Sequence, residues 1–518
     1  KFKEFFMAIL LELHATKDDI LQSYINEIYM GQNGPFQVRG FGSAAEYYFG
    51  KPLSELSLPD CALLAAIVNS PGLFSPFRAP ERAHQRRDLV LTQMEKQGLI
   101  SAEQADQAKK APLPKERPGI LSEPAPFFVD AVQKQLDALK IDRSQGLKIY
   151  TTLDLEAQEA AQDAVKRGLE RIEKDFKRVA ELKAKGKVLE GVLISSDPET
   201  GYVQAVVGGR SFKQSQFNRA IQSHRQIGSV IKPFVYLAAF ESQTEDGEPY
   251  TPLTLVNDDP VKIKYEKQQW TPANYEKKYY GNIPLFFALK NSLNAATARV
   301  ALQAGLEPLV ELIQDLGVSS NMKALPALSL GAFELYAWEV LQSYSTLARM
   351  GDHTPLTYVI SAEDLDGNEV FRHKIRAESV ADKADVAVLV GMMKQTIETG
   401  TGRSIRQWGF MHPAAGKTGT TSDNKDAWFA GFTPLHVAVA WVGYDDNSSH
   451  GLTGASGAIP IWVDYMMTYA AQFPPVDFAW PEDVEVREID VATQQALGVP
   501  EDPKLPLAPV QLVFKKSQ

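Results

Sequence analysis

Three short motifs whose residue types can perform acyl transfer follow one another along the chain: Ser229-Val230-Ile231-Lys232, Ser292-Leu293-Asn294 and Lys417-Thr418-Gly419-Thr420. A serine hydroxyl is a poor nucleophile at neutral pH and needs a base beside it. Residues three apart on a helix share a face, so Lys232 can reach the Ser229 oxygen. A lysine acts as a base only if its pKa falls, and burial near a second cation such as Lys417 lowers it. The motifs therefore predict one site that transfers an acyl group through a serine ester.

These motifs differ in how specific they are. Ser-x-x-Lys occurs at Ser229, Ser320 and Ser422, so one match alone carries little weight. Ser-x-Asn likewise occurs at residues 292, 319 and 422. Lys-Thr-Gly occurs once, and only Ser229 and Ser292 precede it in the required order with domain-scale gaps between the motifs. Ser422-Asp423-Asn424 follows it by two residues. We interpret that triplet as a chance match or as part of the rim of the site.

The Lys-Thr-Gly motif fits an edge strand that binds an anion. Glycine allows a substrate backbone to approach closely, while threonine hydroxyls and a lysine charge can hold a terminal carboxylate. Residues 428–432 and 437–442 are predicted to form two further strands. The upstream run at residues 399–403 is interpreted as a glycine turn, because it lacks the strand-to-helix context of a phosphate loop.

Hydrophobic spacing and proline positions predict four segments: 1–110, 111–190, 191–473 and 474–518. The first is predicted to be helical. The second begins with a proline-rich linker, since proline breaks helices, and contains a long charged helix over residues 155–187 that is expected to be solvated. The third alternates strands and helices, and the last resembles a peripheral tail. The expected fold is therefore multidomain α+β.

Composition excludes some functions. The 518 residues carry a net charge of −10, which argues against nucleic-acid binding. The histidines show no metal-ligand spacing, so no metal site is predicted from them. No apolar run is long enough to cross a membrane and no signal peptide is visible. The chain begins Lys-Phe-Lys-Glu without Met, and we interpret it as a fragment, so the lack of a membrane segment here says little about the parent protein.

The residues around the three motifs resemble the transpeptidase domain of class A penicillin-binding proteins over about residues 190–470. The likeness rests on residues 226–233, 290–294 and 416–421. It implies a β-lactamase-like domain with an antiparallel sheet flanked by helices. In that family the serine matched by Ser229 attacks the D-Ala-D-Ala bond of a peptidoglycan stem peptide, and the lysine matched by Lys232 is the base. β-Lactams inhibit such enzymes covalently.

The same resemblance implies roles for the other motif residues. Ser292 would relay the proton to the leaving D-Ala, and Asn294 would hold the peptide amide. Lys417 would add positive charge. Thr418 and Thr420 would hold the terminal carboxylate beside Gly419, and the amides of Ser229 and Thr420 would form the oxyanion hole.

The N-terminal residues resemble glycosyltransferase family 51, whose lysozyme-like helical domain polymerises lipid II. Lys1-Phe2-Lys3-Glu4 is similar to the end of one family motif, and residues 20–31 and 47–51 are similar to two later ones. By resemblance, Lys1 would contact donor pyrophosphate and Glu4 would support catalysis near a donor bound to Mg²⁺. The family motifs with the general-base glutamate lie upstream of these, so we expect no glycosyltransferase activity from this chain alone.

Residues 31–42 and 454–458 resemble the 1b-type members of Gram-negative bacteria. This likeness implies the periplasmic face of the inner membrane, with stem peptides, lipid II, β-lactams and envelope activator proteins as partners. Transpeptidation would need no cofactor. Two alternatives stay open: a hydrolase, either a D,D-carboxypeptidase or a β-lactamase, and a catalytically silent sensor or scaffold on the same fold.

Overall fold

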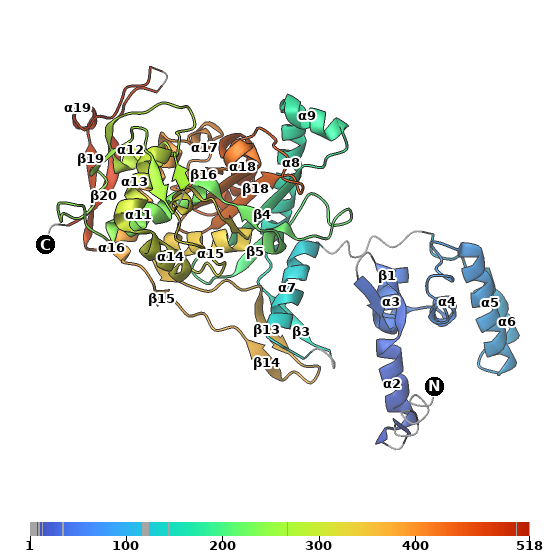
Figure 1. Ribbon diagram of the computed structural model, residues 1–518. Helices are drawn as coiled ribbons and strands as arrows, with labels where there is room; N and C mark the ends of the chain where they lie inside the picture. The colour runs from blue at the N-terminus through green and yellow to red at the C-terminus, as the bar shows by residue number, and fades with distance from the viewer. Residues whose placement is uncertain are drawn as a thin grey trace. The chain divides into compact units, whose positions relative to one another are not determined.

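The computed structural model forms two compact units, Lys1–Glu123 and Pro124–Gln518, coloured along the chain in Figure 1. It describes these residues: 8, 11, 12, 14–33, 36–115, 124–142, 146–266, 268–503 and 505–516. The first unit is mainly helical and the second is built on an antiparallel sheet flanked by helices, which is the α+β architecture predicted from the sequence. Within the described ranges, no helix is both long enough and apolar enough to cross a bilayer.

The described part of the N-terminal unit includes the helices α2 (Lys17–Glu27), α3 (Gly40–Phe49), α4 (Leu58–Val68), α5 (Pro80–Lys96) and α6 (Ala102–Lys110). A small hairpin of β1 (Tyr29–Asn33) and β2 (Phe36–Arg39) interrupts them. The hairpin departs from the helical prediction because, in β2, the buried Val38 stands between the exposed Gln37 and Arg39, which is the period-two pattern of a strand. Lys1 and Glu4 lie outside the described residues.

A five-stranded antiparallel sheet is the centre of the second unit, in the order β16-β17-β18-β4-β5. Its strands are β16 (Ala415–Thr420), β17 (Asp426–Phe432), β18 (Val437–Gly443), β4 (Glu190–Ser196) and β5 (Val203–Val207). The strands predicted at residues 428–432 and 437–442 are confirmed. Every residue of β4, β17 and β18 is buried, which explains their nearly continuous apolar sequences.

Helices cover both faces of this sheet (Figure 1). On one face lie α8 (Leu155–Asp175) and α18 (Gly454–Thr468), packed against side chains such as Phe429 and Ala440. On the other lies α15 (Ala337–Ala348), packed against the alternate residues of the same strands. Successive strand residues point to opposite faces, so each strand supplies both cores.

The long charged helix differs from its prediction. It is not solvated all round, because Ala161, Val165, Leu169 and Ile172 recur at helical spacing and are buried against the sheet. It also ends at Asp175, and a shorter helix, α9 (Lys177–Ala184), follows.

The C-terminal residues also depart from the predicted peripheral tail. Strands β19 (Val484–Ile489) and β20 (Val510–Lys515) pair antiparallel. Val513 and Phe514 are buried in the main core, where β20 packs on α16 (Lys383–Glu398). The prediction was wrong because the many prolines and acids of this segment outweighed the short apolar sequence of β20, which packs in the core of the second unit.

Candidate active site

Ser229 lies on a tight turn that leads into a buried helix. The turn is the 3-10 helix η2 (Gly228–Ile231), followed directly by α11 (Lys232–Phe240), and Ser229 is only partly buried. Its neighbours are held from two sides: Tyr344 Oη donates to Val230 O at 2.8 Å, and Trp428 Nε1 donates to Gln226 O at 2.9 Å. The serine is therefore presented on a rigid support and stays partly exposed.

Lys232 is fully buried and makes two hydrogen bonds to the second motif. Its Nζ donates to Ser292 O at 2.6 Å and to Asn294 Oδ1 at 2.7 Å. Burial, together with the nearby charge of Lys417, holds the pKa of Lys232 well below its usual value, and the charge of Asp258 opposes this shift. The structure thus brings Lys232, Ser292 and Asn294 together.

Lys417 reaches the same serine from the sheet. Its Nζ donates to Ser292 Oγ at 2.9 Å and to Thr418 O at 3.1 Å. Lys417 is fully buried, and burial lowers its pKa to about 7. Ser292 therefore contacts both lysines, one through its carbonyl and one through its hydroxyl.

The backbone of Ser292 has an uncommon conformation. It links α12 (Leu285–Lys290) to α13 (Asn294–Ala304) with φ at 58°, in the left-handed region that non-glycine residues rarely adopt. Residues held in such a region are often part of a functional site. Here the conformation turns the carbonyl and the hydroxyl of one residue toward two different lysines.

The strand of the third motif lies directly against the turn that carries Ser229. A Cβ on Gly419 would lie 2.6 Å from Val230 Cγ2 and 2.8 Å from Ile227 O. A Cβ on Gly228 would lie 2.6 Å from Thr420 O. Only glycine allows these two backbones to approach so closely. This contact places the Ser229 turn beside Thr420, as the predicted oxyanion hole requires.

The two threonines of β16 are held by different neighbours. Thr420 Oγ1 accepts from the backbone N–H of Gly454, at the start of α18, at 3.0 Å. The hydroxyls of Thr418 and Thr401 are 2.7 Å apart. Thr401 was interpreted only as part of a glycine turn, so sequence reasoning missed its place in the site.

Thr401 is positioned by the segment that also carries the second motif. Its N–H donates to Lys290 O at 3.1 Å, and Lys290 Nζ donates to Thr399 Oγ1 at 3.2 Å. The repeated Thr-Gly-Thr-Gly at residues 399–402 is the signal that could have marked it. Its two glycines allow the turn to pass close to other backbone, since a Cβ on Gly400 would lie 2.4 Å from Lys290 O.

The other matches to the motifs have structural partners. The hydroxyls of Ser319 and Ser320 donate to the carboxylate of Glu339 at 2.8 and 2.7 Å. Asn424, in the turn after β16, donates to Leu452 O at 2.9 Å. His224 is exposed and its ring lies 3.8 Å from that of Tyr336.

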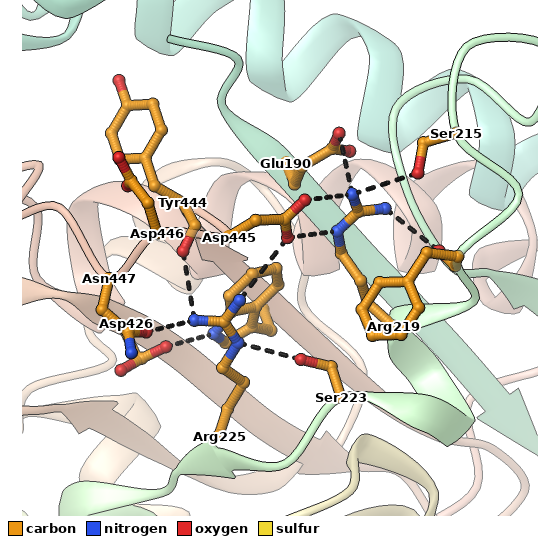
Figure 2. A network of polar contacts seen from close by, with 12 residues as sticks. Glu190, Ser215, Arg219, Ser223, Arg225, Asp426, Tyr444, Asp445, Asp446 and Asn447 are labelled. Carbon is orange, nitrogen blue, oxygen red and sulfur yellow. Dashed lines mark hydrogen bonds and ion pairs between the residues drawn. The ribbon is translucent and has the colours of Figure 1, made fainter.

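An ion-pair network anchors the segment just before Ser229 to the end of β18 (Figure 2). Arg219 is buried and pairs with Asp445 and Glu190, with Nε donating to Asp445 Oδ1 at 2.7 Å. Arg225 donates to Tyr444 O at 3.1 Å and lies 5.0 Å above the ring of Trp441. Several independent contacts thus hold the segment that leads into η2, the turn that carries Ser229.

Among the described residues, no group of three or more histidine, cysteine, aspartate or glutamate side chains could hold a metal ion. The chemistry available in the described site is that of a serine, two buried lysines and hydrogen-bond donors. These groups can form and break a serine ester.

Comparison with known proteins identifies both units. Residues 1–95 match the family model "Transglycosylase" and residues 191–459 match "Penicillin binding protein transpeptidase domain". Among curated relatives, penicillin-binding protein 1B of Vibrio cholerae is 34% identical over 504 residues, covering 96% of this chain and 63% of that protein. Penicillin-binding protein 1B of Escherichia coli is 35% identical over 501 residues, covering 95% of this chain and 57% of that protein.

Two further matches extend this result. Penicillin-binding protein 1A of Aquifex aeolicus is 32% identical over 581 residues, covering 96% of this chain and 78% of that protein. The crystal structure of penicillin-binding protein 1A from Haemophilus influenzae shares the fold, with a TM-score of 0.76 at 24% identity over 93% of this chain and 89% of that one. The matched domains and relatives agree with the site geometry, and the chain belongs to the class A penicillin-binding proteins.

Proposed function

We propose that the second unit is a penicillin-sensitive D,D-transpeptidase that cross-links peptidoglycan stem peptides through an ester on Ser229. One observation carries this proposal: Lys232, one turn after the serine, is fully buried with both of its hydrogen bonds directed at the second motif. A neutral amine has two N–H bonds and one lone pair. Since both N–H bonds have acceptors, the lone pair is free to accept the proton of Ser229.

Acylation then follows from the positions of the other groups. The Ser229 oxygen attacks the carbonyl carbon of the penultimate D-Ala while its proton passes to Lys232 Nζ. The N–H groups of Ser229 and Thr420 stabilise the oxyanion. When the peptide C–N bond breaks, the leaving D-Ala nitrogen takes a proton through the Ser292 hydroxyl, which accepts from Lys417 Nζ, while the Ser292 carbonyl accepts from Lys232 Nζ. The products are the Ser229 ester and free D-Ala.

The second half-reaction releases the enzyme. An amine of a neighbouring stem peptide attacks the ester carbonyl, forms the cross-link and returns a proton to Ser229. Water can replace the amine and give hydrolysis. Lys417, Thr418 and Thr420 line the strand that would hold the terminal carboxylate, a charge-assisted contact that favours substrates and β-lactams carrying that group.

The remaining expectations concern the parent protein. We propose lipid II, stem peptides and envelope activator proteins as its partners, and the periplasmic face of the inner membrane as its location. The first unit's lack of glycosyltransferase activity in this chain, and its requirement for Mg²⁺, stay predictions because Lys1 and Glu4 lie outside the described residues. No cofactor is proposed for the serine-ester chemistry.

Labelling with a fluorescent penicillin tests the proposal. The folded chain is expected to form a long-lived covalent adduct that survives denaturing electrophoresis, and Ser229→Ala is expected to abolish it. Ser320→Ala is the matched control, because Ser320 also begins a Ser-x-x-Lys match but donates its hydroxyl to Glu339, and it should label normally. An unlabelled folded chain would support the silent scaffold, and rapid release of the label would support a β-lactamase.

A further inference from the structure

Helix α13 begins at the catalytic motif without a local cap. Its preceding residue is Leu293, whose side chain cannot accept a hydrogen bond, although the first N–H groups of a helix need acceptors. Two residues distant in sequence supply them: Asp258, which follows β7 (Leu255–Asn257), and Asn274, in the loop between β9 (Gln268–Trp270) and β10 (Asn282–Pro284). Asn274 Oδ1 accepts from the N–H of Asn294 at 2.7 Å and of Ala295 at 3.2 Å, and Asp258 Oδ1 accepts from that of Ala296 at 3.3 Å.

Asn274 and Asp258 form one buried unit. Asn274 Nδ2 donates to Asp258 Oδ2 at 2.8 Å and to Lys278 O at 2.8 Å, so its side-chain oxygen and nitrogen are both engaged. Asp258 is fully buried and Asn274 is 4% exposed. A buried carboxylate is costly unless several donors satisfy it. Here the asparagine and the positive end of the helix dipole do so.

The loop that carries Asn274 also holds the side chain of Asn294. Asn294 Nδ2 donates to Ala273 O at 2.6 Å, while its Oδ1 accepts from Lys232. Ser292, two residues before, has the left-handed backbone described above, a conformation that persists only where its surroundings hold it. The start of α13 is therefore fixed from the loop, and the two acceptors for Lys232 lie at that start.

We propose that Asp258 and Asn274 are positioning residues for acylation. They hold the start of α13 so that Ser292 O and Asn294 Oδ1 accept the two N–H bonds of Lys232 and leave its lone pair for Ser229. This inference rests on the proposed transpeptidase function. It assigns an acylation role to two residues that belong to none of the three motifs.

An exchange of the pair tests this role. Asp258→Asn places an amide donor among N–H groups, and Asn274→Asp places two carboxylates together, so each single change breaks the match of donors and acceptors. The double variant Asp258→Asn/Asn274→Asp restores it within the pair. Asp259→Asn, on the exposed neighbouring residue, is the control for the loss of one negative charge.

The measurement is the rate constant of acylation by a fluorescent penicillin, separated from its binding constant, with folding checked by circular dichroism. Each single variant is expected to lose on the order of 10- to 100-fold in the acylation step, as for small displacements of reacting groups. The double variant should recover to within about 3-fold of the rate of the unaltered chain. The unaltered chain must itself form the covalent adduct, because without that adduct it is the proposed function, and not this inference, that has failed. If neither single change slows acylation, or if the double variant stays slow, the inference is wrong. If a single variant does not fold, the double variant alone decides, by labelling at the normal rate or failing to.

The pH profile separates positioning from a purely structural cap. Lys417 and Asp258 are the charged groups whose fields act on Lys232, with opposite effects on its pKa. Loss of the Asp258 charge lowers the pKa of Lys232 further. The acid limb of acylation should therefore move to lower pH in Asp258→Asn and not in Asp259→Asn. An unmoved acid limb in Asp258→Asn would contradict the effect of the Asp258 charge on the base, Lys232.

Discussion

Two fully buried lysines meet at one serine, and this arrangement decides their protonation. Two ammonium groups cannot both be buried at low cost in such a site. Burial lowers the pKa of Lys417 to about 7, and burial together with the Lys417 charge holds that of Lys232 well below its usual value. Because the charge of Lys417 acts on Lys232, we assign the neutral form to Lys232, the lysine nearer to Ser229 in sequence, and the positive charge to Lys417, which lies on β16.

A single substitution tests the assignment of the base. Lys232→Arg keeps hydrogen-bond donors at this position but is permanently charged, since arginine cannot lose its proton near neutral pH. We expect the acylation rate with fluorescent penicillin to fall by about 10³-fold, within the range for losing a general base. Lys264→Arg, on an exposed position of β8 (Ile263–Tyr265), should react normally. Unchanged acylation in folded Lys232→Arg would assign the base to another group.

At the level of elements, the site depends on how closely β16 approaches η2. The Ser229 turn and the Lys-Thr-Gly strand touch through glycines, while Tyr344 and Trp428 hold the turn from α15 and β17. The proposed oxyanion hole takes one N–H from each of these two elements. If either element moved by a fraction of an ångström, the N–H groups of Ser229 and Thr420 would no longer point at the same oxygen.

Gly419→Ala should therefore damage catalysis. Its new methyl group would lie 2.6 Å from Val230 Cγ2 and 2.9 Å from Trp428 Cβ, so β16 must move away from the turn. We expect destabilisation of about 1–3 kcal/mol by chemical denaturation and a larger relative loss in acylation than in penicillin binding. Gly72→Ala, where a Cβ meets nothing within 4 Å, is the control. Normal acylation by Gly419→Ala would show that this approach is not needed.

Across the whole molecule, buried titratable groups couple stability to pH. His436 and His450 are 5% and 1% exposed, and burial lowers the pKa of each to about 4. Burial raises the pKa of Glu241 to about 7 and that of Asp385 to about 6, which acts in the opposite direction. A histidine with a depressed pKa binds fewer protons folded than unfolded between about pH 6.5 and 4. Its contribution to stability is therefore lost as pH falls through that window.

His436→Gln removes one of these groups and should flatten the acid limb of stability. Relative to the unaltered chain, its free energy of unfolding should fall by roughly 3 kcal/mol less between pH 7 and pH 4. The comparison isolates this histidine because the other titrating groups are shared. Urea unfolding at both pH values measures it, with the exposed His224→Gln as control. Parallel pH dependences in the variant and the unaltered chain would refute the role of His436.

The amino-acid sequence alone predicted the residues of the acyl-transfer motifs and individual strands of the central sheet. Ser229, Lys232 and Lys417 follow from residue types and spacing, and the strands follow from apolar runs, because both signals are local. The family likeness supplied the expected roles of Ser292 and Asn294 in that site. Local patterns also gave two wrong predictions. The charged helix has a buried apolar face, and the proline-rich C-terminal segment contains the buried strand β20.

Only the tertiary structure decided how these residues work together. Ser292 contacts one lysine with its carbonyl and the other with its hydroxyl because of a backbone conformation that no motif encodes. Thr401 meets Thr418 across 17 positions of sequence, and Asn274 caps Asn294 across 20. Such contacts depend on which loop packs against which helix. That choice is made by the burial of both faces of the sheet at once, which no short window of sequence contains.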